Sequence, residues 1–189
     1  MATHIPERLV GDRVVLRRHT LDDAPALVKA ITASIDHLRP WMPWVQHEPQ
    51  SVAQRRDMLA EWIGGWDATT NFPVAMVDPA DESRIVGGCG LHRRGGPNQI
   101  EIGYWVHVDF TGQGVASEAS RLLTNAGLIL DGVDEVLICH DAANIASGMV
   151  PRKLGFTHIE EYRVPRTAPA ESGLHWKWRM TEGDWKHRP

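Results

Sequence analysis

The residues with the clearest chemical potential form a short turn between an apolar segment and a helical pattern. Residues 99–108 are apolar and rich in β-branched and aromatic side chains, which is typical of a buried strand. Gly112 and Gly114 follow on either side of Gln113, and from Val115 onward apolar residues recur at helical spacing. The first N–H groups of a helix lack partners within the helix, and glycines admit a bulky phosphate. The sequence therefore predicts an anion site at this turn.

The turn differs from two common phosphate-binding motifs. It lacks the Gly-Lys-Ser/Thr ending of a P-loop and the full Gly-x-Gly-x-x-Gly pattern of a dinucleotide site. The histidines are scattered, and neither a His-Glu-x-x-His motif nor paired Cys-x-x-Cys motifs occur. Nucleotide hydrolysis is therefore disfavoured, and no metal site is expected.

The overall composition indicates one globular domain over residues 1–189, with 42% hydrophobic residues. A net charge of −4 offers no basic surplus for nucleic acid. No apolar run approaches the ~20 residues of a membrane-spanning helix, and the first ten residues lack the apolar core of a signal peptide. Cys89 and Cys139 lie in apolar segments, as reduced buried thiols do. We therefore expect a cytoplasmic protein that binds neither nucleic acid nor membrane.

The elements that position the turn follow from hydrophobic periodicity. Strands are expected at residues 13–17, 71–78, 84–92, 99–108, 135–140, from 156 onward, and 174–180. Helices are expected at about 21–32, 51–66, from 115 onward, and from near 144 to 154. Short turns join the early strands, which predicts antiparallel pairing, whereas helices separate the later strands, which predicts parallel crossovers. We expect an α/β (mixed α+β) fold with a twisted mixed sheet of about seven strands and helices on both faces.

This order of elements resembles the GNAT superfamily of acyl-CoA N-acetyltransferases. The turn at 112–116 (GQGVA) and the later Asn144 with residues 153–156 (KLGF) carry the resemblance. Residues 38–44 (LRPWMPW), 90–92 (GLH) and 101–106 (EIGYWV) are similar to the RimJ/RimL-like branch, whose best-known members acetylate protein N-terminal amines. The resemblance extends from about Leu9 to Trp185. It implies the GNAT fold, in which acetyl-CoA binds in a cleft between splayed strands.

The resemblance implies which residues bind acetyl-CoA, the co-substrate. The pyrophosphate is expected at the main-chain amides of Gly112, Gln113, Gly114, Val115, Ala116 and Ser117. The pantetheine arm is expected along the main chain from Val106 to Val108, where it would pair as another strand does. Asn144 matches a family asparagine that contacts the pantetheine arm.

Two positions depart from the family pattern. Thr111 stands where the phosphate turn usually begins with Gln or Arg. Pro151 stands seven residues after Asn144, where many GNAT enzymes have a tyrosine that protonates the departing thiolate. Ser147, which matches a serine common in the RimJ/RimL-like branch, is then the nearest hydroxyl candidate for this acid.

The expected reaction is direct attack of an amine on the thioester carbonyl, which requires removal of an amine proton. Glu101 is the first candidate base, and a salt-bridged strand glutamate is the alternative interpretation. His92 and His107 could relay protons or be structural. The same two interpretations apply to three further residues, which are His140, Asp141 and His175. Ser147 is either a functional hydroxyl, which acts as the acid or binds acetyl-CoA through a carbonyl contact, or a hydroxyl bonded to its own helix backbone.

Trp41 and Trp44 lie in a proline-rich segment and are candidates for the wall of the acceptor site, together with His92. Core packing or a dimer contact would also explain the tryptophans. The first hypothesis is an acetyl-CoA-dependent N-acetyltransferase acting on an amine, such as a protein N-terminal α-amine, as a monomer or homodimer. One alternative acceptor is a small amine, for example an antibiotic, an amino-acid conjugate or a polyamine. A non-catalytic acyl-CoA-binding regulatory module is the third hypothesis, because of Thr111 and Pro151.

Overall fold

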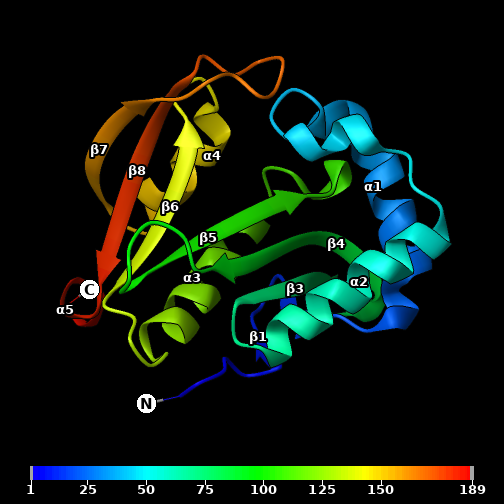
Figure 1. Ribbon diagram of the computed structural model, residues 1–189, viewed down its shortest axis with the longest axis horizontal. Coiled ribbons are helices and arrows are strands. Elements are labelled where there is room, and N and C mark those ends of the chain that lie inside the picture. The colour runs from blue at the N-terminus through cyan, green and yellow to red at the C-terminus, as the bar shows by residue number, and fades with distance from the viewer. Residues whose placement is uncertain (1, 188–189) are drawn as a thin grey trace.

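One mixed β-sheet organises the protein, whose computed structural model describes residues 2–187. The strands are β1 (Arg8–Val10), β2 (Val15–Arg18), β3 (Asn71–Asp78), β4 (Asp81–His92), β5 (Gln99–Val106), β6 (Glu135–Asp141), β7 (Thr157–Arg163) and β8 (Leu174–Thr181). Their order within the described residues is β1-β2-β3-β4-β5-β6-β8-β7 (Figure 1). The mixed sheet is confirmed, but it has eight strands rather than about seven. The additional strand, β1, has only three residues, which is too short for an alternating pattern to be recognised.

Five α-helices cover the sheet: α1 (Ala24–Leu38), α2 (Val52–Asp67), α3 (Val115–Leu128), α4 (Ile145–Lys153) and α5 (Glu182–Lys186). Short 3₁₀ segments are η1 (Leu21–Asp23), η2 (Pro43–His47) and η3 (Val108–Phe110). α1 and α2 pack on one side of β3 and β4, and α3 packs behind β4, β5 and β6 (Figure 1). Helices on both faces are therefore confirmed. No helix within residues 2–187 is long and apolar enough to cross a membrane.

Strand β3 shows how the two faces are filled. Val74 and Met76 are buried in the cluster that contains α3, whereas Ala75 and Val77 are buried in the cluster that contains α1. Successive side chains of a strand point to opposite faces, so a strand buried on both sides reads as a continuous apolar run. The sheet is therefore the middle layer of three.

The expected end of α1 near residue 32 is wrong, because the helix continues to Leu38. Ser34 is fully buried within it. The Ser34 hydroxyl donates to the carbonyl of Ala30 over 2.9 Å and accepts the N–H of Val108 over 3.1 Å. A polar residue that would mark a helix end on the surface thus has two partners inside the protein, and it ties α1 to the segment after β5.

β5 and β6 are the only neighbouring strands among residues 2–187 that run parallel. Their register has three pairs, Gln99 with Glu135, Ile100 with Val136, and Glu101 with Leu137. Beyond these pairs the two strands separate, and Figure 1 shows them diverging from a common end. The parallel crossover through α3 and the splayed strands are thus both present. The edge of β5 that faces β6 is open from residue 102 to the end of the strand.

Glycine and a carboxylate fix the start of α3. Gly114 is the N-cap with φ of +82°, in the left-handed region that a side chain disfavours. Within residues 2–187 no side chain caps this helix. Glu118, in the first turn, accepts the main-chain N–H groups of Asp12 and Arg13 over 3.0 and 2.6 Å. These bonds hold the turn between β1 and β2 against the N-terminus of α3.

The β7–β8 connection, residues 164–173, reaches across to the segment before η2. The N–H of Ala170 donates to the carbonyl of Pro40 over 2.9 Å. At its other end the buried carboxylate of Asp141 accepts the Ser172 hydroxyl and the N–H of Gly173, over 2.9 and 2.8 Å. The connection is therefore a strap that runs from the end of β6 to the α1–η2 segment, as the orange loop in Figure 1 shows.

Candidate active site

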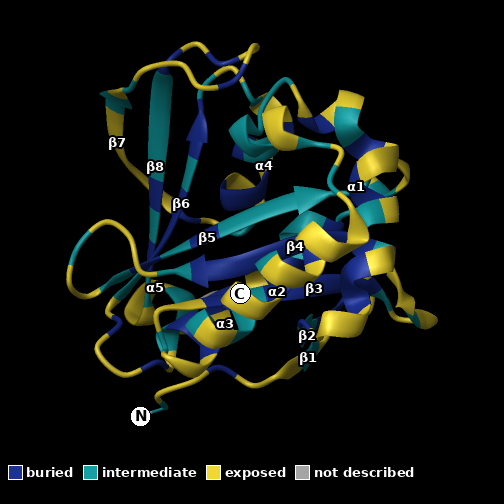
Figure 2. Cartoon of the chain, turned by 45° about the vertical axis from the view of Figure 1, so that its right-hand side comes forward, coloured by how far each residue is buried: buried dark blue, intermediate teal, exposed yellow. Residues whose placement is uncertain are grey.

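A cavity of about 670 Å³ lies where β5 and β6 separate. It is lined from β4, β5 and β6, from α1, α2 and the segment around η2, and from the start of α4. Figure 2 shows β5 half-buried along most of its length, whereas its neighbours β4 and β6 are mostly buried. The side chains of β5 thus remain partly open because the cavity runs along this strand.

The cavity brings together most of the predicted catalytic and acceptor residues. Those that line it are Glu101, Ser147, Asn144, Trp41, Trp44 and His92. His175 and His140 also line it. The segment 37–49, for which we expected a packed loop or short helix, forms η2 and presents both tryptophans. Residues separated by more than 100 positions in sequence therefore share one cavity.

The predicted phosphate turn lines a second hollow of about 480 Å³. Gly112, Gly114 and Ser117 line it, next to the first turn of α3, whose main-chain N–H groups have no partners within the helix. The side chain of Gln113 donates to the carbonyl of Asp109 over 2.7 Å, so it shapes the turn. The remaining residues behave differently: Val115 is buried in the core, Ala116 packs against it, and Thr111 donates its hydroxyl to the carbonyl of Val108.

Three cationic side chains line this second hollow together with the carboxylate of Glu118, and no pattern in the sequence connects the three with the turn. They are Arg13, Arg121 and Lys153. Arg13 belongs to the turn between β1 and β2, and its Nη1 lies 3.4 Å from the carbonyl oxygen of Gln113. The donor set consists of helix amides and cationic side chains, which fits a phosphorylated ligand.

The main chain after β5 is less available than the family resemblance implied. The N–H of His107 donates to Val86, and the N–H of Val108 donates to Ser34. Among the described residues, Val106 and Val108 line neither hollow. The open strand edge next to β6 therefore lies at residues 102–106, slightly before the expected 106–108. The observed range 102–106 and the expected range 106–108 share only Val106.

Glu101 faces the cavity. It pairs across the strands with His92 of β4, and this register places it on the same face as Gly103 and Trp105. Its carboxylate lies 3.4 Å from Nη1 of Arg94, and the side chain is 18% exposed. The geometry is compatible with Glu101 as a base, because the side chain reaches the cavity, and also with a structural role, because it forms a salt bridge.

His92 lies beside Glu101 as a neutral imidazole. Its Nδ1 is 3.2 Å from Oδ1 of Asn71. Burial, reinforced by the nearby charge of Arg94, lowers the pKa of His92 to about 4. An imidazole with this pKa carries no charge at neutral pH, so it can accept or pass a proton only transiently.

Tyr104 is a residue that sequence analysis missed. Its hydroxyl lies 3.0 Å from Oγ of Ser147 and 3.1 Å from the carbonyl oxygen of Ser147. Burial raises the pKa of Tyr104 to about 12, so the phenol stays protonated. It donates to the carbonyl, which leaves the Ser147 hydroxyl free to turn toward the cavity. Asn144 accepts the N–H of Ser147 through Oδ1 and caps α4, and this position for the helix start is as expected.

Several candidates have structural partners instead. His140 accepts from Nε1 of Trp178 over 3.0 Å, and its Nδ1 lies 2.8 Å from the carbonyl oxygen of Asp141. His107 accepts the N–H of Asp109 at the start of η3. Burial, together with the nearby Glu101 carboxylate, raises the pKa of the Cys139 thiol to about 12. Cys139 lines the cavity, but a thiol with this pKa is a poor nucleophile.

The fold and the two hollows agree with what comparison with known proteins finds. Residues 13–157 match the acetyltransferase (GNAT) domain family, and the chain belongs to this family. It is an acetyltransferase of the GNAT type.

The most informative relatives are ribosomal N-acetyltransferases and an immunity protein. The chain is 23% identical over 167 residues to the putative ribosomal N-acetyltransferase YdaF of Bacillus subtilis strain 168, covering 88% of each chain. It superposes with a TM-score of 0.81 on RimL, a ribosomal L7/L12 α-N-protein acetyltransferase solved with coenzyme A, at 18% identity and with 96% and 98% of the two chains covered. The microcin C7 self-immunity acetyltransferase MccE, solved with acetyl-CoA and AMP, gives 0.82 at 15% identity, covering 95% and 98%.

The low pKa of His92 predicts a pH-dependent stability. Above about pH 6.5 the imidazole is neutral in both the folded and the unfolded chain. As the pH falls from 6.5 to about 4, the unfolded chain binds a proton that the folded chain excludes, so the free energy of unfolding decreases. We expect His92→Gln to lose less stability than the wild type between pH 7 and pH 5 in urea unfolding. His37→Gln, at an exposed imidazole on α1, is the control. Equal losses in the wild type and His92→Gln would contradict the prediction.

Proposed function

We propose that this GNAT protein transfers an acetyl group from acetyl-CoA to an amine by direct attack. The proposal rests on one observation: the cavity passes between β5 and β6 where the two strands separate, and residues on both faces of the sheet line it. Tyr104 and Ser147 line it near α4, while Glu101 lines it on the face that packs against α1 and α2. A hydroxyl pair and a carboxylate thus stand on opposite sides of the gap through which a thioester could be reached.

The donor side fits coenzyme A. The pyrophosphate would bind the first amides of α3 within the ring of Arg13, Arg121 and Lys153. The pantetheine amides would pair with the open edge of β5 at residues 102–106, next to Asn144 at the start of α4. RimL with coenzyme A and MccE with acetyl-CoA support this choice of donor.

Three residues of the chain, Glu101, Ser147 and Tyr104, take part in the proton transfers. Glu101 removes a proton from the acceptor ammonium, directly or through a water molecule, so that the neutral amine attacks the carbonyl carbon. As the new C–N bond forms and the C–S bond breaks, the nitrogen loses its second proton to a water molecule, and the hydroxyl of Ser147 donates its proton to the departing thiolate sulfur. The O–H of Tyr104 then turns from the Ser147 carbonyl to Oγ of Ser147, 3.0 Å away, and returns a proton to it, and Tyr104 regains one from solvent. The high pKa of Cys139 disfavours an acetyl-cysteine intermediate, which supports direct transfer.

The acceptor class has two candidates. The names of YdaF and RimL favour a protein N-terminal α-amine. A small amine is favoured by the strap, because the bond between Ala170 and Pro40 closes one side of the cavity and limits the width of the acceptor. In both candidates the amine is at the end of a narrow chain, so either could enter the cavity with the amine first.

Thiol release from acetyl-CoA tests the function. The purified protein would be assayed with a panel of N-terminal peptides and small amines, and acetyl-CoA binding would be measured by calorimetry. Turnover of any amine supports the proposal, and turnover of small amines alone removes the protein N-terminus as acceptor. Tight binding without turnover of any acceptor would instead identify a non-catalytic acyl-CoA-binding module.

A substitution in the phosphate turn tests the donor site. Gly114→Glu should abolish acetyl-CoA binding, because a side chain and a negative charge would enter the hollow next to Arg13, whose Cδ lies 3.5 Å from the added Cβ. Calorimetry gives the dissociation constant. Gly132→Glu is the matched control, since Gly132 also has a positive φ, of +70°, and its Cβ would meet nothing within 4 Å. Wild-type affinity in a folded Gly114→Glu protein would refute the placement.

The hydroxyl pair can be tested by a double-mutant cycle. Ser147→Ala should lower kcat about tenfold, because the thiolate loses its proton donor. Tyr104→Phe should lower kcat by a smaller factor. The double variant should be no slower than Ser147→Ala alone, because the two hydroxyls act as one unit. The dissociation constant of acetyl-CoA should stay unchanged in all three. Additive losses, or a wild-type rate in Ser147→Ala, would remove the pair from the mechanism.

A further inference from the structure

The half of the cavity next to Glu101 is walled by large apolar side chains that remain partly uncovered. We call this half the acceptor lobe, and its walls are Trp41, Met42, Trp44, Met58, Trp62 and Trp105. Trp44 and Trp105 meet edge to face with ring centroids 6.2 Å apart, and Trp62 packs against His19 at 5.2 Å. Four indole rings with open surface around one hollow are well suited to cover an apolar or planar group.

Two glycines deepen the floor of the acceptor lobe. Gly88 of β4 pairs with Trp105 of β5, and a Cβ on Gly88 would lie 2.6 Å from the indole Nε1 of Trp105. The absence of a side chain lets this ring lie flat across the sheet. Gly103, two residues from Glu101, lets the ring of His92 lie over the strand in the same way, 3.4 Å from where its Cβ would be. A strand that is interrupted by glycine here makes room for a ligand beside the carboxylate.

The charges around the lobe leave no free cation for an anionic acceptor. Among the described residues the only lysine or arginine side chains that line the cavity are Arg55 and Arg94. Arg55 forms a buried ion pair with Glu48 over 2.5 Å, each side chain being 3% exposed, and Arg94 pairs with Glu101. A phosphate or carboxylate on the acceptor would have to break one of these pairs.

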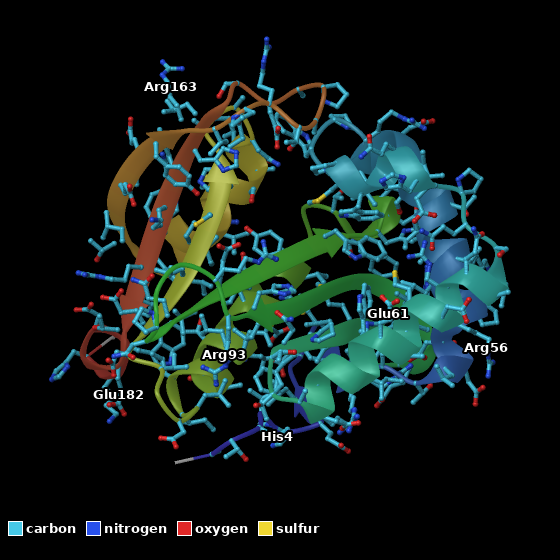
Figure 3. The ribbon with its side chains drawn as sticks, in the orientation of Figure 1. His4, Arg56, Glu61, Arg93, Arg163 and Glu182 are labelled. Atoms are coloured by element: carbon cyan, nitrogen blue, oxygen red, sulfur yellow. The ribbon has the colours of Figure 1, made fainter. Side chains whose placement is uncertain are left out.

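One carboxylate at the lobe remains unpaired. Within residues 2–187 Glu61 of α2 has neither an ion pair nor a side-chain hydrogen bond, although it lines the cavity. Glu61 is exposed, so it lies at the mouth of the cavity, and Figure 3 shows its side chain leaving α2 in a different direction from that of Arg56. An ammonium group approaching the lobe would meet this negative charge, which favours a cationic acceptor.

We infer that the acceptor is a cationic amine with an apolar, preferably aromatic, group beside the reacting nitrogen and without a phosphate or carboxylate near it. The inference rests on the proposed function and specifies its substrate class. The amine lies against Glu101, and its neighbouring apolar group sits among the indole rings of the acceptor lobe. The same chemistry describes the first residue of a protein N-terminus and a small alkylamine that carries an aromatic group. It separates this chain from relatives such as MccE, whose structure holds AMP.

Amino-acid amides test the inference without a carboxylate at the far end. Glycinamide, leucinamide and phenylalaninamide vary the apolar group, and asparaginamide with aspartic acid α-amide varies only the charge at constant size. We expect kcat/KM for phenylalaninamide to exceed that for glycinamide by about tenfold or more. We also expect asparaginamide to be a better acceptor than aspartic acid α-amide, with the difference shrinking at high salt.

Variants connect this preference to the acceptor lobe. Trp41→Ala and Trp62→Ala should each lower the ratio of kcat/KM for phenylalaninamide over glycinamide by about tenfold. A ratio within one variant is insensitive to the amount of folded enzyme. Trp185→Ala, in α5 on the opposite side of the molecule, should leave the ratio unchanged. Glu61→Gln should raise the KM of every amine, whereas Glu182→Gln, also in α5, should not.

The outcomes are distinguishable from those that test the proposed function. Equal kcat/KM for glycinamide and phenylalaninamide, or a preference for the aspartic acid amide, would overturn the inference and leave the acetyltransferase function standing. A preference for phenylalaninamide that survives both tryptophan substitutions would also overturn it, because the acceptor lobe would not be its source. Turnover of no amine at all, with acetyl-CoA bound, would overturn the inference together with the proposed function.

Discussion

The separation of β5 from β6 is the constraint on which the rest of the structure depends. The two strands share three register pairs and then diverge, so that the N–H and C=O groups along one edge of β5 open inside the protein rather than at its surface. Backbone groups in such a place need partners, and a ligand with amide groups can supply them. The helix that joins the strands must begin at the open end of β5, which puts its unpaired amides next to the gap. The second helix begins at the open end of β6 and brings Ser147 to the other side.

Local signals in the sequence predicted this arrangement well where the responsible residues are close along the chain. The strand, glycine turn and helix around Gly114, and the cap of α4 at Asn144, follow from spacing and backbone chemistry. Relations between distant residues left no such signal. Tyr104 meets Ser147 across 43 positions, and Arg13 reaches Gln113 of the glycine turn across 100 positions. The end of α1 was misjudged for the same reason, since Ser34 finds its second partner 74 residues away.

The two hollows offer a ligand different kinds of interaction. The hollow at the start of α3 is surrounded by cations and free amides, so that charge dominates there. The cavity around Glu101 contains several ionic groups, but two ion pairs, Glu48 with Arg55 and Glu101 with Arg94, each cancel their own charge. The indole rings therefore supply much of the contact surface. Charged groups are thus concentrated at the proposed donor site, and apolar surface is concentrated at the proposed acceptor lobe.

The strap of residues 164–173 has a consequence for how such an enzyme can diversify. It is anchored at the catalytic half by Asp141, through Ser172 and Gly173, and touches the other half through the main chain of Ala170 and Pro40. Because the second contact uses only backbone atoms, almost any sequence can make it. The length and composition of the strap can therefore drift, and the span of the opening with them, while the donor site and the proton-transfer groups keep their positions. Substitutions in the strap can therefore change which acceptors enter the cavity without moving the proposed catalytic groups.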